Sequence, residues 1–174
     1  MSYQILLGIL VVLLLTAGNL ALMLLNRPQP QGEVWRVTRV LSGQLVEIAQ
    51  GNKTEKLRLI GVTAPLAEQA PFGAEARLKL QKLVEGQEVL VELDINPRDR
   101  ADRLLGYIWK DGQMVNQQLV EEGYALTESV VPNVKYKTLL DNAQSKARLL
   151  EYGIWNPEKP LRQAPASARR RRVE

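Results

Sequence analysis

Residues 40–46 (VLSGQLV) and 57–66 (LRLIGVTAPL) are the two segments of this chain that most restrict its fold. In the first segment, Ser42 and Gly43 predict a turn between a strand at 34–40, whose side chains alternate between two faces, and a strand at 45–49. Gly51 and Asn52 predict a second turn, which leads into a third strand at 56–62. The two segments therefore belong to one unit of three consecutive strands.

The rest of the chain alternates helical and strand patterns. In order, the patterns predict a helix at 74–84, strands at 88–93 and 104–109, a short helix at 114–122, and a last helix that Asn133 caps and Gly153 ends. Three strands, a helix, two strands and two helices predict a small closed β-barrel with helices packed outside it, an α+β fold.

Composition and charge exclude several kinds of site. The chain has no Cys and no His, so disulfides, thiolate nucleophiles and imidazole bases are absent. The net charge of +4 divides into +1 for residues 1–27, −1 for residues 28–155 and +4 for residues 156–174. A central region near neutrality differs from the broad basic surface that nonspecific nucleic-acid binding uses.

The N-terminal residues 5–25 form a run of 21 residues without a charge. As a helix this run would reach about 30 Å, the thickness of the hydrocarbon layer of a bilayer. A cleaved signal peptide is the alternative, but no Lys or Arg precedes the run and no Ala-x-Ala site follows it. We therefore predict a retained single-pass anchor within residues 1–27. Because Arg27, Arg36 and Arg39 follow it, we expect the rest of the chain on the cytoplasmic side of the membrane.

Three further regions follow the anchor. Residues 28–32 (PQPQG) predict a proline-rich stalk, residues 33–157 the globular domain, and residues 158–174 a basic, disordered tail. The tail includes Arg169, Arg170, Arg171 and Arg172. This run could contact anionic lipid, bind nucleic acid or an acidic protein partner, or only increase solubility.

A series of short motifs, in a fixed order, links the domain to a known family. The series comprises Gly43, Arg58-Leu59 with Pro65, FGAEA at 72–76, Asp99 with Arg103 and Gly106-Tyr107, DGxMVN at 111–116, GYA at 123–125, and Ala147 with GIW at 153–155. Over about residues 34–155 the chain resembles the staphylococcal-nuclease (thermonuclease-like) family. The resemblance implies an OB-fold-like five-stranded barrel with three helices. The uncharged run at 5–25 adds one transmembrane helix before it.

The active-site motifs of that family are altered in this chain. In active members the turn reads Asp-Gly-Asp-Thr and the third strand ends Asp-Thr-Pro-Glu. The resemblance assigns Ca²⁺ binding to the second Asp of the turn and to the Asp after the strand. It assigns to the Glu the orientation or deprotonation of the attacking water. Gln44 and Thr63 replace the two metal-binding aspartates, and Leu66 replaces the general-base glutamate. Arg58 and Arg103 match the two phosphate-binding arginines.

These replacements predict a protein without Ca²⁺ or another cofactor, because neutral oxygens do not offset the desolvation of the ion and leucine accepts no proton. The leading hypothesis is a non-catalytic binding or scaffolding module, an accessory component of a membrane complex. One alternative is a metal-dependent nuclease whose site is rebuilt from Glu68, Asp99 or Asp102. Another is a non-catalytic nucleic-acid-binding module.

Two groups of side chains allow two interpretations each. Arg58 and Arg103 could hold an anion, or they could form structural ion pairs, for example Arg103 with Asp99. The aromatic residues could stack on bases, as in many OB-folds, but we expect them to pack in the core of the fold or at its boundary. They are Trp35, Tyr107, Trp109, Tyr124, Tyr136 and Trp155.

Overall fold

The computed structural model describes Gly8 and residues 30–165 of the chain. Apart from Gly8, the predicted anchor at 5–25 lies outside these residues, as do the first part of the stalk and the four-arginine run. Within them, no helix combines the length and the apolar character that a membrane crossing requires.

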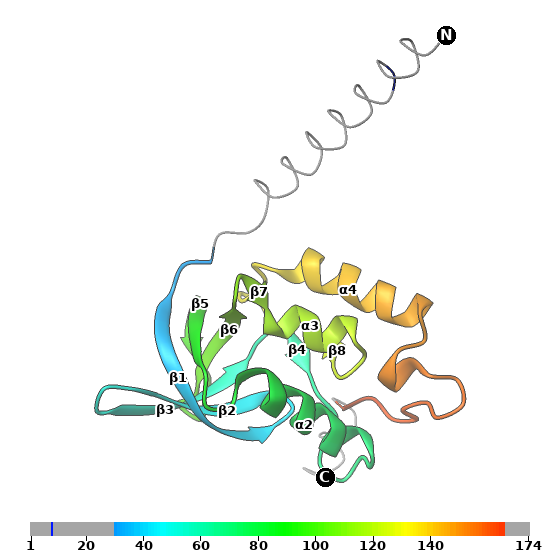
Figure 1. Ribbon diagram of the computed structural model, residues 1–174, viewed down its shortest axis with the longest axis horizontal. Helices are drawn as coiled ribbons and strands as arrows, with labels where there is room; N and C mark the ends of the chain where they lie inside the picture. Colours follow the sequence, from blue (N-terminus) through cyan, green and yellow to red (C-terminus); the bar gives the residue numbers. More distant parts are fainter. Residues whose placement is uncertain (1–7, 9–29, 166–174) are drawn as a thin grey trace.

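Five strands close a barrel (Figure 1). They are β1 (Glu33–Ser42), β2 (Leu45–Gln50), β3 (Lys53–Leu59), β5 (Glu88–Arg98) and β6 (Leu104–Lys110). The order is β3-β2-β1-β5-β6, with antiparallel neighbours, and a parallel pairing of β3 with β6 closes the ring. The predicted five-stranded barrel is confirmed.

Three short strands complete the sheets. β7 (Gln113–Met114) pairs with β6 across a tight turn, while β4 (Val62–Thr63) and β8 (Leu126–Thr127) form a separate two-stranded sheet. The third strand was expected to run from 56 to 62 without a break. It ends instead at Leu59, because Gly61 adopts a φ of +75°, which turns the chain into β4.

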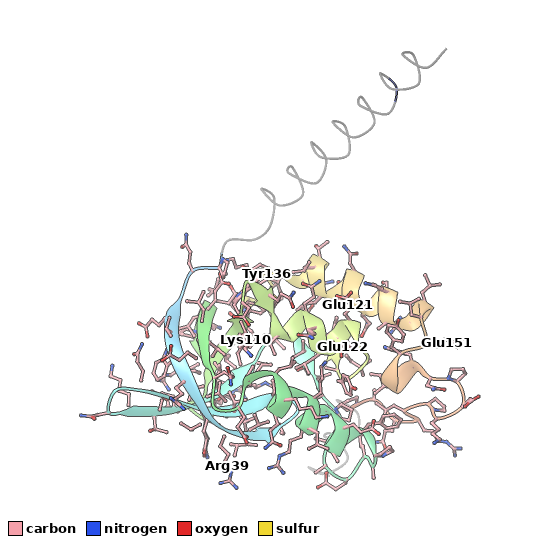
Figure 2. The ribbon with its side chains drawn as sticks, in the orientation of Figure 1. Arg39, Lys110, Glu121, Glu122, Tyr136 and Glu151 are labelled. Carbon is pink, nitrogen blue, oxygen red and sulfur yellow. The ribbon has the colours of Figure 1, made fainter. Side chains whose placement is uncertain are left out.

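A bulge in β1 changes which side chains face the core. Strict alternation placed Trp35 and Val37 on one face and Val40 on the other, yet all three are buried. The pairing of β1 with β2 shifts register between Val37 and Arg39, and this irregularity turns Val40 inward. The regular alternation expected over 34–40 is therefore wrong at Val40. Arg39 is exposed and points away from the barrel (Figure 2).

Three α-helices cover one side of the barrel (Figure 1). They are α2 (Phe72–Val84), α3 (Val115–Glu121) and α4 (Lys137–Leu149), and a 3₁₀ turn, η1 (Gly153–Trp155), follows. Helix α2 packs on β1 and helix α4 on α3, each through its buried apolar face. The three expected helices are therefore present.

The last helix begins later than its sequence suggested. It starts at Lys137, after Tyr136, so Asn133 is not its N-cap. The Asn133 side chain instead joins two segments. The Asn96 N–H donates to Asn133 Oδ1 and Asn133 Nδ2 donates to the Asn96 carbonyl, both at 2.8 Å. The connection between β8 and α4 is thereby fixed to β5.

The segment after residue 157 lies against the domain. The Leu161 N–H donates to the Ile154 carbonyl at 3.2 Å, and Gln69 Nε2 donates to the Gln163 carbonyl at 2.6 Å. Because these bonds and the burial of Pro165 fix the chain, residues 158–165 are not the disordered start of a tail that we expected. The described domain extends to Pro165.

Aromatic side chains fill the barrel near its junction with α4. The ring centroids of Tyr107 and Tyr136 lie 4.8 Å apart and those of Trp109 and Tyr136 5.6 Å apart, both edge to face. Trp35 is also buried. For these four residues the expected packing role is confirmed, and they do not form an exposed stacking surface. Tyr124 and Trp155 are partly buried.

Candidate functional site

The turn before β2 and the segment after β4 meet at one end of the barrel. The Leu59 N–H donates to the Gln44 carbonyl at 2.9 Å, and the Ala64 N–H donates to Gln44 Oε1 at 2.5 Å. A Cβ atom on Gly43 would lie only 2.7 Å from the Cβ atoms of Ala64 and Ala76, so this turn requires a glycine. The fold thus brings together the two sequence segments that carry the family motifs.

The residues at the two metal positions do not fit a calcium site. Gln44 and Thr63 are buried, with 5% and 3% of their surface exposed, and neither carries a charge. The amide oxygen of Gln44 already accepts a backbone hydrogen bond, and Thr63 Oγ1 is buried without a hydrogen-bond partner. Calcium requires six to eight oxygen ligands, several of them carboxylates. Within residues 30–165 no three Asp or Glu side chains gather as a metal-binding group.

Leu66 occupies the position of the family's general base in a loop that precedes α2. Its N–H donates to Gln69 Oε1 at 2.9 Å, and the Gln69 N–H donates back to the Leu66 carbonyl at 2.9 Å. The side chain of Leu66 has no atom that accepts a proton. Because Gln69 also holds Gln163, the C-terminal segment reaches this same loop.

The first phosphate-binding position, Arg58 on β3, is paired with a carboxylate of the same chain. Arg58 Nη2 lies 2.7 Å from Glu128 Oε2, with 20% and 26% of the two side chains exposed. The Glu128 N–H donates to the Gly61 carbonyl at 3.0 Å, directly after the pairing of β8 with β4. The short sheet therefore fixes an acid opposite Arg58.

The second position, Arg103, is paired in the same way. Arg103 Nε and Nη2 lie 2.7 and 2.6 Å from Asp99 Oδ2, so the ion pair expected from the sequence is present. Asp99 also accepts hydrogen bonds from the N–H groups of Ala101 and Arg103. Burial alone would raise the pKa of Asp99, but these hydrogen bonds and the charge of Arg103 outweigh burial and hold it below its usual value.

The remaining acids considered from the sequence lie apart from a common centre. Asp102 is exposed and pairs with Arg98 at 3.4 Å, and Glu68 lies exposed in the loop before α2. The fold therefore assembles Gln44, Thr63 and Arg58 as the motifs predicted, and among residues 30–165 no cluster of three acids forms beside them.

Comparison with known proteins agrees with this architecture. A family model described as staphylococcal nuclease homologue matches residues 56–157. The chain belongs to this family. It is 34% identical to the thermonuclease of Staphylococcus intermedius over 130 residues, which cover 72% of this chain and 77% of that protein. It is also 32% identical to an uncharacterized endonuclease of Escherichia coli over 127 residues, or 72% of this chain and 79% of that protein. The family resemblance inferred from the motifs is confirmed.

Sequence reasoning missed Glu128 as a member of the site. This residue is 70 positions from Arg58 and belongs to none of the family motifs. Its only sequence signal is a carboxylate shortly after the Gly123-Tyr124-Ala125 motif, and the pairing of β4 with β8 is needed to place it. The candidate site of this chain therefore contains the Arg58–Glu128 ion pair, which the family motifs do not reveal.

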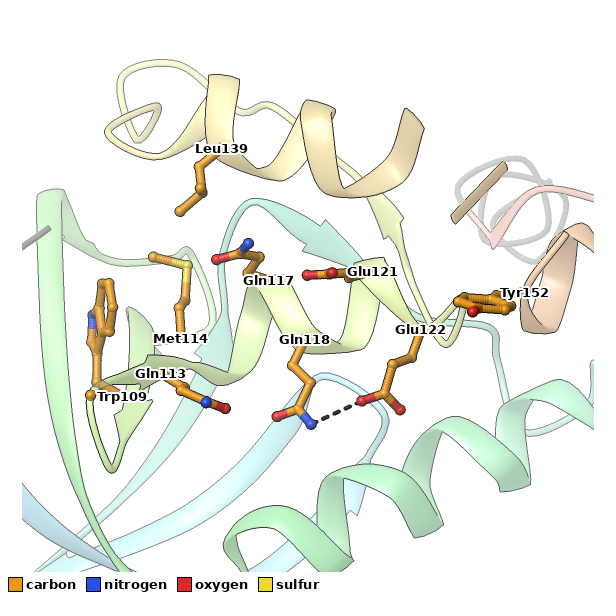
Figure 3. A pocket seen from close by; sticks show the side chains of 10 residues that line it. Trp109, Gln113, Met114, Gln117, Gln118, Glu121, Glu122, Leu139 and Tyr152 are labelled. Atoms are coloured by element: carbon orange, nitrogen blue, oxygen red, sulfur yellow. Dashed lines mark hydrogen bonds between the residues drawn. The ribbon is translucent and has the colours of Figure 1, made fainter. Parts of the chain in front are cut away.

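A hollow of about 530 Å³ lies on a different part of the domain (Figure 3). Trp109, Met114 and Leu139 form its apolar part. Its two acids are neutralised: Glu121 pairs with Lys146, and Glu122 pairs with Lys79 at 2.6 Å. None of the candidate-site residues lines this hollow, so it is not part of the family's active site.

The low pKa of Asp99 predicts how the Asp99→Asn variant responds to pH. A carboxyl group whose pKa is lower in the folded than in the unfolded state stabilises the fold above its unfolded pKa. That contribution is lost as the pH falls through the folded pKa. We expect Asp99→Asn to lower the unfolding free energy near neutral pH by less than about 1 kcal/mol, because the pair is partly exposed. The unfolding free energies of Asp99→Asn and of the unaltered protein should become equal in acid.

Urea denaturation over a series of pH values measures this convergence. Asp102→Asn is the matched control, because the Asp102 side chain is 87% exposed and its pair with Arg98 is long. If the difference in unfolding free energy between Asp99→Asn and the unaltered protein stays constant into the acid range, the lowered pKa of Asp99 does not stabilise the fold.

Proposed function

We propose that this chain is a membrane-anchored member of the staphylococcal nuclease family that does not hydrolyse nucleic acid and acts as a binding or scaffolding module. One observation carries the proposal. The metal and general-base positions hold Gln44, Thr63 and Leu66, and none of these side chains supplies a carboxylate. Without them the domain has no means at these positions to bind the ion or to activate water.

The electrostatics of the arginines support the same conclusion. Phosphodiester cleavage needs positive charge directed at the developing negative charge of the phosphate. Glu128 lies at contact distance from Arg58 and neutralises it, so the positive charge of Arg58 is already paired within the chain.

Membrane anchoring is the second part of the proposal. It rests on the uncharged run at 5–25, and the following Arg27, Arg36 and Arg39 favour a cytoplasmic domain. The run Arg169–Arg172 would then lie near anionic headgroups, where each basic residue contributes about 1 kcal/mol to attraction. Nucleic acid or an acidic protein of a membrane complex is the alternative partner of this run.

Nuclease activity of a soluble fragment, residues 31–174, tests the catalytic part. We expect no chelator-sensitive cleavage of single-stranded DNA, double-stranded DNA or RNA with Ca²⁺ or other divalent ions, because no carboxylate stands at the metal positions. The Arg58→Ala/Arg103→Ala double variant is the control for contaminating nuclease. Chelator-sensitive cleavage that this variant loses would contradict the proposal and favour a metal-dependent nuclease with a rearranged site at Glu68, Asp99 or Asp102.

A further inference from the structure

Five aliphatic side chains are exposed on two neighbouring segments of the domain. Leu93 and Ile95 lie on β5, and Val130, Val131 and Val134 lie in the connection between β8 and α4. The exposed fractions reach 82% for Val131 and 71% for Ile95. We call these five residues the apolar rim. Apolar side chains exposed along one edge of a domain mark surfaces that contact a partner or a membrane.

Hydrogen bonds between the two segments hold the rim together. The reciprocal bonds of Asn96 and Asn133, both 2.8 Å, place the residue after Ile95 against the residue before Val134. The Asn133 N–H donates to the Val130 carbonyl at 2.9 Å, so Val130 and Val131 lie in a tight turn. The rim is therefore a fixed feature of the folded domain.

The N-terminal chain approaches the domain beside the rim. Glu33 pairs with Val91 in the antiparallel register of β1 and β5, so the residues that precede Glu33 run toward Leu93. Gln31, Gly32 and Leu93 line one hollow of about 370 Å³. In Figure 1 the first described residues, in blue, and the connection before α4, in yellow, lie on the same edge of the domain.

The distance from the uncharged run to this edge is short. The run ends at residue 25 and the first residue of the described domain is Pro30. Five residue steps span at most about 18 Å, so a bilayer that holds residues 5–25 must lie close to the edge that carries the rim.

We propose that the apolar rim contacts the surface of the bilayer in which the chain is anchored, and thereby orients the domain on the membrane. The inference rests on the proposed anchor. Basic side chains flank the rim: Lys135 and Lys137 are 47% and 53% exposed while they pair with Glu92 and Asp141. Aliphatic side chains with amines beside them are typical of segments that lie in the headgroup region. Because Glu128 lies two residues before Val130, the contact also brings the candidate site close to the lipid surface.

Single-cysteine labelling tests this contact, since the chain has no cysteine of its own. Val131→Cys and Ile95→Cys each carry an environment-sensitive fluorophore, and the full chain is reconstituted into vesicles of phosphatidylcholine and phosphatidylglycerol. Asn52→Cys, at the exposed turn between β2 and β3, is the matched control. Both rim labels should show blue-shifted emission, reduced quenching by iodide and quenching by lipids with a nitroxide on the acyl chain. The label at Asn52 should behave as in water.

Flotation of the same vesicles separates this inference from the anchor on which it rests. If the chain floats with the vesicles but the rim labels are quenched by iodide as strongly as the control, the rim contact is wrong and the anchor stands. If the chain does not float, both are wrong. Protection from iodide without quenching by the nitroxide lipids would mean that protein covers the rim, and this outcome also overturns the proposal.

Discussion

A triple variant with carboxylates at the three altered positions, Gln44→Asp, Thr63→Asp and Leu66→Glu, is expected to cleave DNA in a Ca²⁺-dependent manner. The fold already brings these positions together, and Arg58 lies beside them on β3, where it is paired with Glu128. Two carboxylates would supply the charge that binds the ion, and the glutamate would accept the proton of the attacking water. We expect cleavage on the order of 10²–10³-fold above the background measured with the unaltered fragment, the size of one electrostatic contribution to catalysis. Cleavage of labelled DNA with Ca²⁺ or chelator measures it.

The matched control replaces the same residues by amides: Gln44→Asn, Thr63→Asn and Leu66→Gln. These side chains have the size of the carboxylates without their charge, so they separate a metal effect from a change in packing. Calcium should also raise the thermal unfolding temperature of the carboxylate variant alone. Equal cleavage by both triple variants, or an effect of calcium on the amide variant, would contradict this account of the site.

Substitution of the buried Glu92 should produce the largest loss of stability among single acidic residues considered. Glu92 is 1% exposed and accepts hydrogen bonds from Trp109 Nε1 at 2.8 Å and from Tyr136 OH at 3.0 Å, while it pairs with Lys135. Glu92→Ala leaves these buried donors without an acceptor. We expect the unfolding free energy to fall by about 3–5 kcal/mol, as when one partner of a buried pair is removed.

Urea denaturation followed by tryptophan fluorescence measures this loss. Glu92→Gln should cost less than Glu92→Ala, since it retains one oxygen that accepts a hydrogen bond. Glu88→Ala is the control: it lies exposed at the start of the same strand, where a substitution changes stability by about 0.5 kcal/mol or less. Similar losses for Glu92→Ala and Glu88→Ala would show that the network does not stabilise the domain.

The fold could be predicted from the sequence because its turns, apolar spacing and motifs agree with one another. Gly43 and Gly123 mark turns at which a side chain would collide with neighbouring atoms. The apolar side of α2 faces β1 and that of α4 faces α3, as their spacing allows. The inward turn of Val40 could not be predicted, because a bulge depends on how β1 pairs with β2. Local spacing carries no information about such a register shift.

The candidate site could be predicted only in part. The motifs placed Gln44, Thr63 and Arg58 together, and the four-residue spacing of Asp99 and Arg103 allowed their ion pair. The partner of Arg58 could not be found, because Glu128 reaches it through a two-stranded sheet between distant segments. The bond from Gln69 to Gln163 likewise joins segments 94 residues apart. Contacts of this kind follow from the complete fold rather than from any local pattern.

In the ion pair between Arg58 and Glu128, the Glu128 carboxylate competes with any other anion that could bind Arg58. Folding holds the Glu128 carboxylate 2.7 Å from the guanidinium, and intramolecular partners act at effective concentrations in the millimolar range or above. A free anion that contacts Arg58 alone must exceed this concentration to displace Glu128. A ligand that also engages neighbouring groups gains free energy from several contacts at once, and only such a polyvalent ligand competes at low concentration. The pair thereby raises the concentration that a simple phosphate ion needs to displace Glu128 from Arg58.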